Sequence, residues 1–207
     1  MRNNFLRIFI LFFFIITISA QTKGNDSLKY SFSIGFYRDL SDTYHGGSLF
    51  SGEFKAAKSW YGAVIQFGCF QSSASLKYEI TIENINKTFS IPIDELSIMR
   101  NGSFSFLVEP LKHKLISADL IFGLVYAKSQ STQINTVSYS YSFADESFIY
   151  LYRDYSLIKK THFGYQAGID IKFHLSKSIG LELKSRIQDL SNGGTFFFLG
   201  AGICINL

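Results

Sequence analysis

Apolar and polar residues alternate with a period of two through the stretch 162–187, HFGYQAGIDIKFHLSKSIGLELKSRI. Side chains of a β-strand change face at every residue, so this pattern predicts two strands joined by a short turn at 175–178. One face carries Ile169, Ile171 and Phe173, whereas the other carries Asp170 and Lys172. The apolar face would form the core of a soluble protein but would contact lipid in a membrane barrel. The pattern of one hairpin leaves this choice open.

The same period recurs along the rest of the chain and predicts eight strands in all. Their ranges are 28–38, 47–56, 59–70, 101–109, 114–128, 162–175, 179–187 and 195–207. The chain also contains 22 Phe and 12 Tyr but only 2 Pro. Strands accommodate aromatic residues and exclude proline, so the composition favours an all-β domain.

The connections between these strands alternate strictly between short and longer ones. The short ones are 56–58, 110–113 and 175–178, and the longer ones are 39–46, 71–100, 129–160 and 189–194. An up-and-down barrel in a bacterial outer membrane has this asymmetry, with tight periplasmic turns and larger extracellular loops. A soluble sandwich has no reason to sort its loops in this way. Loop order therefore predicts an eight-stranded antiparallel transmembrane β-barrel.

The two longest connections, 71–100 and 129–160, are themselves strand-like. Residues 75–93 alternate around ENINK, and residues 136–153 alternate around ADE, so both are expected to extend the barrel hairpins beyond the membrane. A second interpretation makes the tyrosines of the latter segment a contact surface, because Tyr offers a large amphipathic area at low entropic cost. These residues are Tyr139, Tyr141, Tyr150, Tyr152 and Tyr155.

The polar faces of the predicted strands carry charges of both signs, whereas the opposite faces are almost free of charge. A Lys or Arg facing the bilayer midplane costs about 2–4 kcal/mol, so the clean face is expected to contact lipid. Eight strands enclose an interior that side chains can fill, so the charges predict an ion-paired core rather than a polar conduit. This predicted lumen charge network comprises Lys29, Glu53, Lys55, Asp119, Asp170, Lys172, Glu182, Lys184 and Arg186.

The N-terminal segment MRNNFLRIFILFFFIITISA has the layout of a secretory signal peptide. Basic residues precede a short apolar block, and Ser19-Ala20 supplies a cleavage site, so residues 1–20 are expected to be removed and 21–207 to form the barrel domain. The segment holds two arginines and no acidic residue, so the remaining chain has a formal charge of +2 instead of +4. This balance does not favour nucleic acid as a partner. Residues 21–207 also contain no apolar run long enough for a membrane helix.

Cys69 and Cys204 are too few for a disulfide scaffold and fall on opposite faces and at opposite ends of the predicted barrel. We therefore expect both thiols to be free.

No cluster of residues predicts catalysis, a metal or a cofactor. His174 and Ser176 are the closest His/Ser pair on one strand, but they lie at a predicted turn and no carboxylate is placed to orient the imidazole. His162 faces the predicted lumen, while His45 and His113 fall in connections. No Cys, His and carboxylate residues have metal-ligand spacing. We therefore expect no catalytic, metal-binding or cofactor-binding residues.

The stretches GYQAGIDIKFHLSKSIGLELKSRI and FFFLGAGICINL resemble the small outer-membrane β-barrel family of Bacteroidetes-type bacteria, which shares the architecture of the OmpA-type membrane domain. The resemblance covers essentially all of residues 21–207 and implies a monomeric barrel in contact with outer-membrane lipid. It also implies recognition by the barrel-assembly machinery through the C-terminal strand. Gly202, Ile205 and Leu207 occupy the places of that assembly signal, although Leu207 replaces the usual aromatic residue.

The sequence thus predicts a non-enzymatic outer-membrane barrel that is structural or binds a surface partner through 71–100 and 129–160. Two alternatives stay open. The first is a lipid-modifying outer-membrane enzyme that uses His162 or His174. The second is a secreted calycin-like carrier whose apolar face lines a ligand cavity, although the Gly-x-Trp motif usual near the first strand of such carriers is absent.

Overall fold

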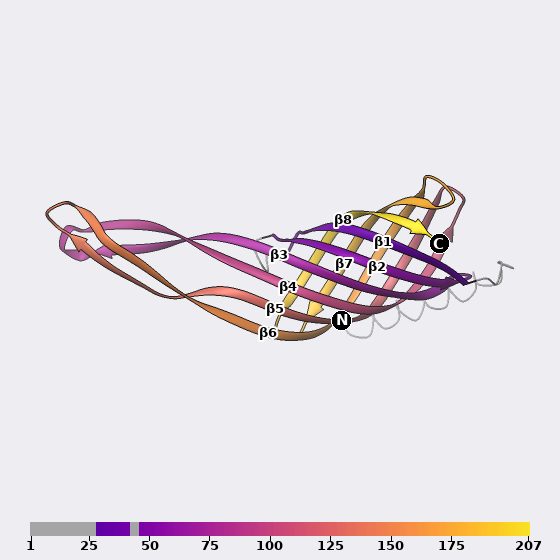
Figure 1. The fold of residues 1–207 in the computed structure, drawn as a ribbon, viewed down its shortest axis with the longest axis horizontal. Coiled ribbons are helices and arrows are strands. Elements are labelled where there is room, and N and C mark those ends of the chain that lie inside the picture. Colours follow the sequence, from indigo (N-terminus) through magenta and orange to yellow (C-terminus); the bar gives the residue numbers. More distant parts are fainter. Residues whose placement is uncertain (1–27, 42–45) are drawn as a thin grey trace, which may run out of the picture.

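Eight antiparallel strands form a closed barrel in which each strand pairs with its sequence neighbours (Figure 1). A computed structural model describes residues 28–41 and 46–207, so the predicted signal peptide at 1–20 and His45 lie outside the described residues. Pairing of β1 with β8 closes the ring. The all-β up-and-down prediction is confirmed. The strands are β1 (Leu28–Asp39), β2 (Ser48–Lys58), β3 (Tyr61–Ile82), β4 (Lys87–Lys112), β5 (Ile116–Ser142), β6 (Ser147–His174), β7 (Ile179–Leu190) and β8 (Gly194–Asn206).

The apolar faces of the strands point out of the barrel, and the polar faces point into it. Phe67, Leu124 and Phe163 are among the most exposed side chains of the barrel, at 69%, 72% and 65%. Arg186, Lys184 and many serines are buried instead. This arrangement reverses that of a soluble protein. The calycin-like alternative is therefore wrong, because the apolar face does not line a cavity.

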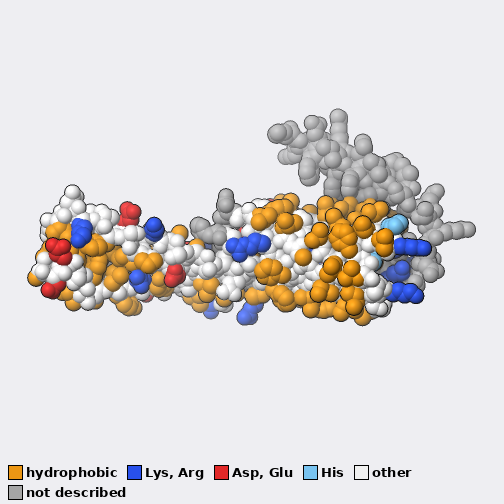
Figure 2. Space-filling model, turned by 90° about the horizontal axis from the view of Figure 1, so that it is seen from above, with side chains coloured by type: hydrophobic (Ala, Val, Ile, Leu, Met, Phe, Trp, Pro, Cys, Tyr) orange, Lys and Arg blue, Asp and Glu red, His pale blue; other side chains and the backbone are white. Residues whose placement is uncertain are grey.

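The length of the apolar exterior matches a bilayer. On β5 the outward positions run from Ile116 to Tyr126, and the next outward residue is Lys128. A spanning strand needs about 9–11 tilted residues, which this run supplies. Arg100 lies opposite Lys128 on β4 and ends the apolar run at the same level. Figure 2 shows the dense hydrophobic surface of the barrel giving way to a more polar projection.

Two long hairpins project from one end of the barrel, which we call the hairpin end (Figure 1). β2 accompanies β3 only as far as Gln71, and β4 pairs with β5 only from Ser97. Beyond these points, β3–β4 and β5–β6 are separate two-stranded ribbons. The segments 71–100 and 129–160 are thus mostly strand, as their alternation of apolar and polar residues predicted. The tips of the hairpins are the short turns 83–86 and 143–146.

The two ribbons pack against each other through an apolar cluster of their own, which we call the tip core. Ile80, Ile82 and Ile91 of the β3–β4 ribbon are buried, and side chains of both ribbons pack around them. Phe89 of the first ribbon contacts Phe148 of the second edge to face, with ring centroids 4.9 Å apart. These contacts fix the position of one ribbon relative to the other. The partly buried members are Phe89, Val137, Tyr141, Phe148 and Leu151.

The opposite end of the barrel, the short-turn end, carries the turns 59–60, 113–115 and 175–178. The turns 59–60 and 113–115 end two residues later than the predicted connections 56–58 and 110–113. The strands continue to pair beyond the point at which apolar and polar residues cease to alternate. Cys69 is exposed and Cys204 is buried, and both are free, as the alternation predicted. No helix among the described residues is long and apolar enough to cross a membrane.

An arginine placed on the lipid-facing band should destabilise the barrel in proportion to its depth. Phe122 lies near the middle of the β5 band, whereas Gln130 also lies on β5 but beyond Lys128. We expect Phe122→Arg to lower the free energy of unfolding by about 2–4 kcal/mol and Gln130→Arg to lower it by about 1 kcal/mol or less. Urea unfolding from phosphatidylcholine vesicles measures both values. Equal costs at the two positions would contradict the assignment of the band.

Candidate functional site

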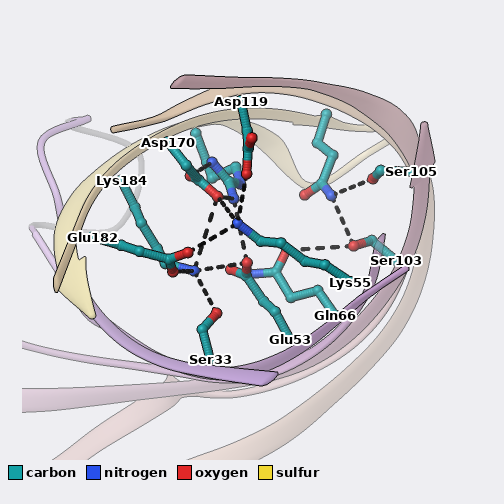
Figure 3. A network of polar contacts seen from close by, with 12 residues as sticks. Ser33, Glu53, Lys55, Gln66, Ser103, Ser105, Asp119, Asp170, Glu182 and Lys184 are labelled. Atoms are coloured by element: carbon teal, nitrogen blue, oxygen red, sulfur yellow. Dashed lines mark hydrogen bonds and ion pairs between the residues drawn. The ribbon is translucent and has the colours of Figure 1, made fainter. Parts of the chain in front are cut away.

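The lumen contains a buried ion-pair network formed by seven residues of four strands, β2, β5, β6 and β7 (Figure 3). Alternation places these side chains inward, because each has an outward-facing apolar residue on at least one side of it in the chain. The ring then brings strands that are distant in sequence into contact across the narrow interior. The residues are Glu53, Lys55, Asp119, Asp170, Glu182, Lys184 and Arg186.

Lys55 lies at the centre of three carboxylates. Its Nζ is 2.8 Å from Asp170 Oδ2, 3.1 Å from Asp119 Oδ2 and 3.2 Å from Glu182 Oε1. Arg186 donates to both oxygens of Asp170, in the bidentate geometry that suits a guanidinium. Each charge in this buried network therefore faces an opposite charge.

Lys184 links the network to the wall on the β1 side. Its Nζ donates to Glu53 Oε2 at 2.7 Å and to Ser33 Oγ at 2.9 Å, and it lies 2.8 Å from Glu182 Oε2. The hydroxyl of Tyr37 donates to the other oxygen of Glu53 at 2.6 Å. Ser33 and Tyr37 are inward-facing network residues that the sequence analysis missed, although their places in the alternation would have identified them.

A glycine on β6 makes room for the largest of these side chains. A Cβ atom on Gly168 would lie 2.6 Å from Arg186 Cδ and 2.5 Å from the Ser185 carbonyl oxygen. Gly168 and Arg186 are direct partners across the β6–β7 ladder. Because Gly168 has no side chain, the Arg186 side chain can pass close to the backbone of β6 and reach Asp170.

The two remaining predicted network residues lie elsewhere. Lys29 is exposed at the short-turn end, where β1 begins. Lys172 is 8% exposed, and its Nζ donates to Asn206 Oδ1 at 3.1 Å. Neither forms an ion pair within the described residues. The structure thus divides the predicted set into a paired network and a separate basic region.

An uncharged polar layer lies beside the network. Gln166 Nε2 donates to Ser103 Oγ and Ser105 Oγ, each at 2.8 Å, and Gln166 Oε1 accepts from Gln188 Nε2 at 3.0 Å. Asn101 extends this chain through its contact with Gln188 Oε1 at 3.3 Å. Amide and hydroxyl groups therefore pair with one another in this part of the lumen, although Asn101 Oδ1 and Gln66 Nε2 have no hydrogen-bond partner among the described residues.

Aromatic and aliphatic side chains fill the lumen at the hairpin end, which the sequence analysis did not predict. Phe70, Phe196 and Phe198 pack with ring centroids 5.5–5.8 Å apart, and Tyr37 and Leu49 join the same cluster. Period-two alternation along 195–207 placed Phe197 on the outward face, where it is 38% exposed, but did not single out Phe196 and Phe198 as an aromatic cluster on the inward face. This cluster and the ion network together fill the hairpin end and the middle of the lumen.

His162 and Ser129 form a buried pair near this end. His162 Nε2 is 2.8 Å from Ser129 Oγ, and His162 Nδ1 is 3.0 Å from the Ser191 carbonyl oxygen. A carbonyl only accepts, so Nδ1 carries the proton and Nε2 accepts from the serine hydroxyl. His162 is 1% exposed and Ser129 8%. The pair has the polarity of a serine–histidine dyad but is closed to substrate in this conformation.

The second His/Ser candidate is not assembled. His174 Nε2 is 3.2 Å from Ser117 Oγ, not from Ser176. Ser176 instead accepts from the backbone N–H of Ser178 and Ile179 and so closes the turn 175–178. Among the described residues no group of three or more Cys, His, Asp and Glu side chains could hold a metal ion.

The predicted tyrosine surface is partly exposed at the tip. Tyr150 and Tyr152 are 55% and 62% exposed, and Tyr139 and Tyr155 are about 40% exposed. Tyr141 differs, because it packs into the tip core against Phe89 and Phe148 with ring centroids 5.5 Å from each. Tyr139 also contacts Phe148, with ring centroids 5.7 Å apart, although it is more exposed than Tyr141.

A closed eight-stranded ring with an apolar exterior and a charged interior defines the class of outer-membrane β-barrels. Solved structures of this class share the fold. The N-terminal β-barrel domain of OprF from Pseudomonas aeruginosa aligns with a TM-score of 0.53 at 12% identity, over 89% of this chain and 100% of that one. Neisserial surface protein A aligns with a TM-score of 0.53 at 9% identity, over 86% of this chain and 98% of that one.

The attachment invasion locus protein Ail of Yersinia pestis, in complex with the heparin analogue sucrose octasulfate, aligns with a TM-score of 0.50 at 10% identity, over 87% of this chain and 97% of that one. No protein-family model matches the chain, and no curated protein is similar to it. At these identities the similarity extends to the fold and no further.

Breaking the buried network should be costly, whereas breaking an ion pair at the rim should not. Asp170→Asn leaves Arg186 and Lys55 without their shared counter-charge, so we expect a loss of about 3–5 kcal/mol in the free energy of unfolding. Lys112→Gln, which removes the partly exposed pair with Glu109, should cost less than about 1 kcal/mol. Urea titration of the refolded barrels measures both. An Asp170→Asn barrel as stable as wild type would show that the network does not stabilise the lumen.

Proposed function

We propose that the protein is an integral barrel of a bacterial outer membrane, without catalytic activity, that holds a binding surface away from the cell on its paired hairpins. The observation that carries this proposal is the tip core, in which buried Ile80, Ile82 and Ile91 join two ribbons far from the barrel. An apolar cluster fixes the relative position of the ribbons, as a binding surface requires. Flexible loops would need no such cluster.

The exposed surface of the tip has the composition of a protein-binding surface. Tyr139 lies between two serines on β5, Tyr150 and Tyr152 lie on β6, and Ile149 next to Tyr150 is 69% exposed. Tyrosine and serine together supply rigid amphipathic area and adaptable hydrogen bonds, the combination found in paratopes. We therefore assign the partner to the class of folded proteins.

The short-turn end then faces the periplasm, and residues 1–20 act as the export signal. The C-terminal strand β8 carries the signal for the assembly machinery, and the barrel acts as a monomer. Membership of the Bacteroidetes-type family stays part of the proposal, supported by the sequence resemblance.

The orientation has a direct test by cysteine labelling. In a Cys69→Ser background, Tyr152→Cys should react with a membrane-impermeant maleimide on intact cells, and Ser176→Cys should react only after lysis. Cys204 is fully buried and serves as an internal blank. Labelling of Ser176→Cys alone on intact cells would invert the orientation and remove the surface role of the hairpins.

The binding role has a separate test by photo-crosslinking. A benzoylphenylalanine in place of Tyr152 should give a discrete protein adduct on cells in their natural growth medium, whereas the same group in place of Phe122 on the lipid band should give none. Tyr150→Ser should weaken the adduct without changing barrel stability, because the side chain is exposed. Absence of an adduct from Tyr152, or one that is insensitive to Tyr150→Ser, would contradict the proposal.

The Ser129–His162 pair supports one competing function, a lipid-directed hydrolase or transferase. Its geometry suits proton transfer from serine to histidine, but a backbone carbonyl orients the imidazole in place of a carboxylate. Our proposal predicts that His162→Ala leaves the phospholipid and glycolipid composition of the cell unchanged by mass spectrometry. A product that disappears in His162→Ala would establish the enzymatic alternative.

A further inference from the structure

The lumen opens at the short-turn end into a cavity of about 780 Å³. Its floor includes Lys55 and Asp119, which belong to the ion-pair network, so the cavity is blind rather than one mouth of a channel. The turns 113–115 and 175–178 contribute to its walls. A volume of this size lies in the range of small-molecule sites, about 300–1,000 Å³.

The side chains around this cavity are predominantly basic. Two side-chain carboxylates line it, and each already has a lysine partner, because Glu109 is 2.7 Å from Lys112 and Asp119 is 3.1 Å from Lys55; the carboxyl group of Leu207 lies at the same cavity. Four further lysines have no carboxylate within ion-pair distance in the described part of the chain, and two imidazoles accompany them. These six residues are Lys29, Lys114, Lys172, Lys177, His113 and His174. Figure 2 shows Lys, Arg and His side chains gathered at the end opposite the hairpins.

Lys172 shows that this charge is not simply solvated. The residue is 8% exposed, and the hydrogen bond from its Nζ goes to a neutral amide oxygen, Asn206 Oδ1, at 3.1 Å. A buried ammonium without a counter-ion is unfavourable. The neighbouring network contains four carboxylates and three cations, so its excess negative charge offsets one lysine at most. Lys29, Lys114 and Lys177 still lie around the same cavity without a partner.

We propose that this basic cavity binds a phosphate-bearing anion, either a soluble phosphate compound or the anionic headgroup of a phospholipid. Lysine ammonium groups bind phosphate as point charges, whereas planar carboxylates favour arginine, which does not line the cavity. The Asn206 amide holds Lys172 toward the interior of the site. The cavity lies at the opposite end of the barrel from the hairpins, so this site does not depend on the proposed function.

Isothermal titration of the full refolded protein in an uncharged detergent, at low salt, tests the site with two probes. Pyrophosphate represents the soluble source, and dihexanoyl phosphatidylglycerol represents the headgroup, with dihexanoyl phosphatidylcholine as its zwitterionic control. We expect saturable binding of at least one anionic probe. The triple variant Lys29→Gln, Lys114→Gln, Lys177→Gln alters exposed side chains and should weaken binding by about tenfold or more.

The matched control removes the same number of positive charges at the hairpin end, through Lys87→Gln, Lys128→Gln and Lys159→Gln, and should leave binding unchanged. Lys172→Gln is the second variant, and a heat-dependent gel shift shows that it folds. Binding of pyrophosphate alone identifies a soluble ligand, and binding of phosphatidylglycerol alone identifies a lipid headgroup. Absence of binding, equal loss in the control variant, or equally tight binding of citrate would overturn the proposal.

Discussion

The hydrogen bonds between β1 and β8 close the ring, and the rest of the molecule depends on this closure. In hydrocarbon an unpaired backbone N–H or C=O is costly, so strands can span a bilayer only when the sheet has no edge. Eight strands then enclose a space that only side chains can occupy. Because alternation points every second residue into that space, the lumen has to accommodate Glu53, Lys55, Asp170 and Arg186 together, and they are stable there only as mutual partners.

The hairpins project beyond the barrel, where the sheet is not closed, so their stability depends on a different interaction. Beyond Gln71 the outer edge of β3 has no neighbour, and the ribbon that it forms with β4 would be marginally stable alone. Packing against the β5–β6 ribbon through Ile82 and Phe148 supplies the missing apolar contact. Charged residues such as Lys77 and Glu79 on the unpaired strand disfavour pairing with other chains. The projection is therefore a small, separately packed unit that the barrel anchors.

The lumen is layered along its axis, and the layers divide the possible functions. Aromatic residues such as Phe70 and Phe198 fill the hairpin end, ion pairs around Lys55 fill the middle, and unpaired lysines line the cavity at the short-turn end. The first two layers are packed and support a structural role. Among the described residues, the cavity and the exposed tip of the hairpins are accessible to a ligand and carry unpaired polar or charged groups.

Much of this architecture follows from the sequence alone. The period of two in stretches such as 162–187 determines which residues share a face, and the alternation of short and long connections indicates that the charged face is the inner one. The members of the network were predictable for the same reason, because Asp170, Glu182, Lys184 and Arg186 fall at alternate positions. The period-two alternation in 136–153 likewise predicted an extended hairpin.

Tertiary structure decided which inward residues meet, because their partners come from strands far apart in the chain. Lys55 and Asp170 are neighbours only through ring closure, and sequence spacing could not distinguish them from Lys29, which lies on the same face but beyond reach. The aromatic cluster of Phe70, Phe196 and Phe198 and the packing of Tyr141 into the tip core likewise depend on contacts between strands that are distant in the chain. The sequence by itself thus determined faces and topology, whereas pairing across the lumen depended on the geometry of the closed sheet.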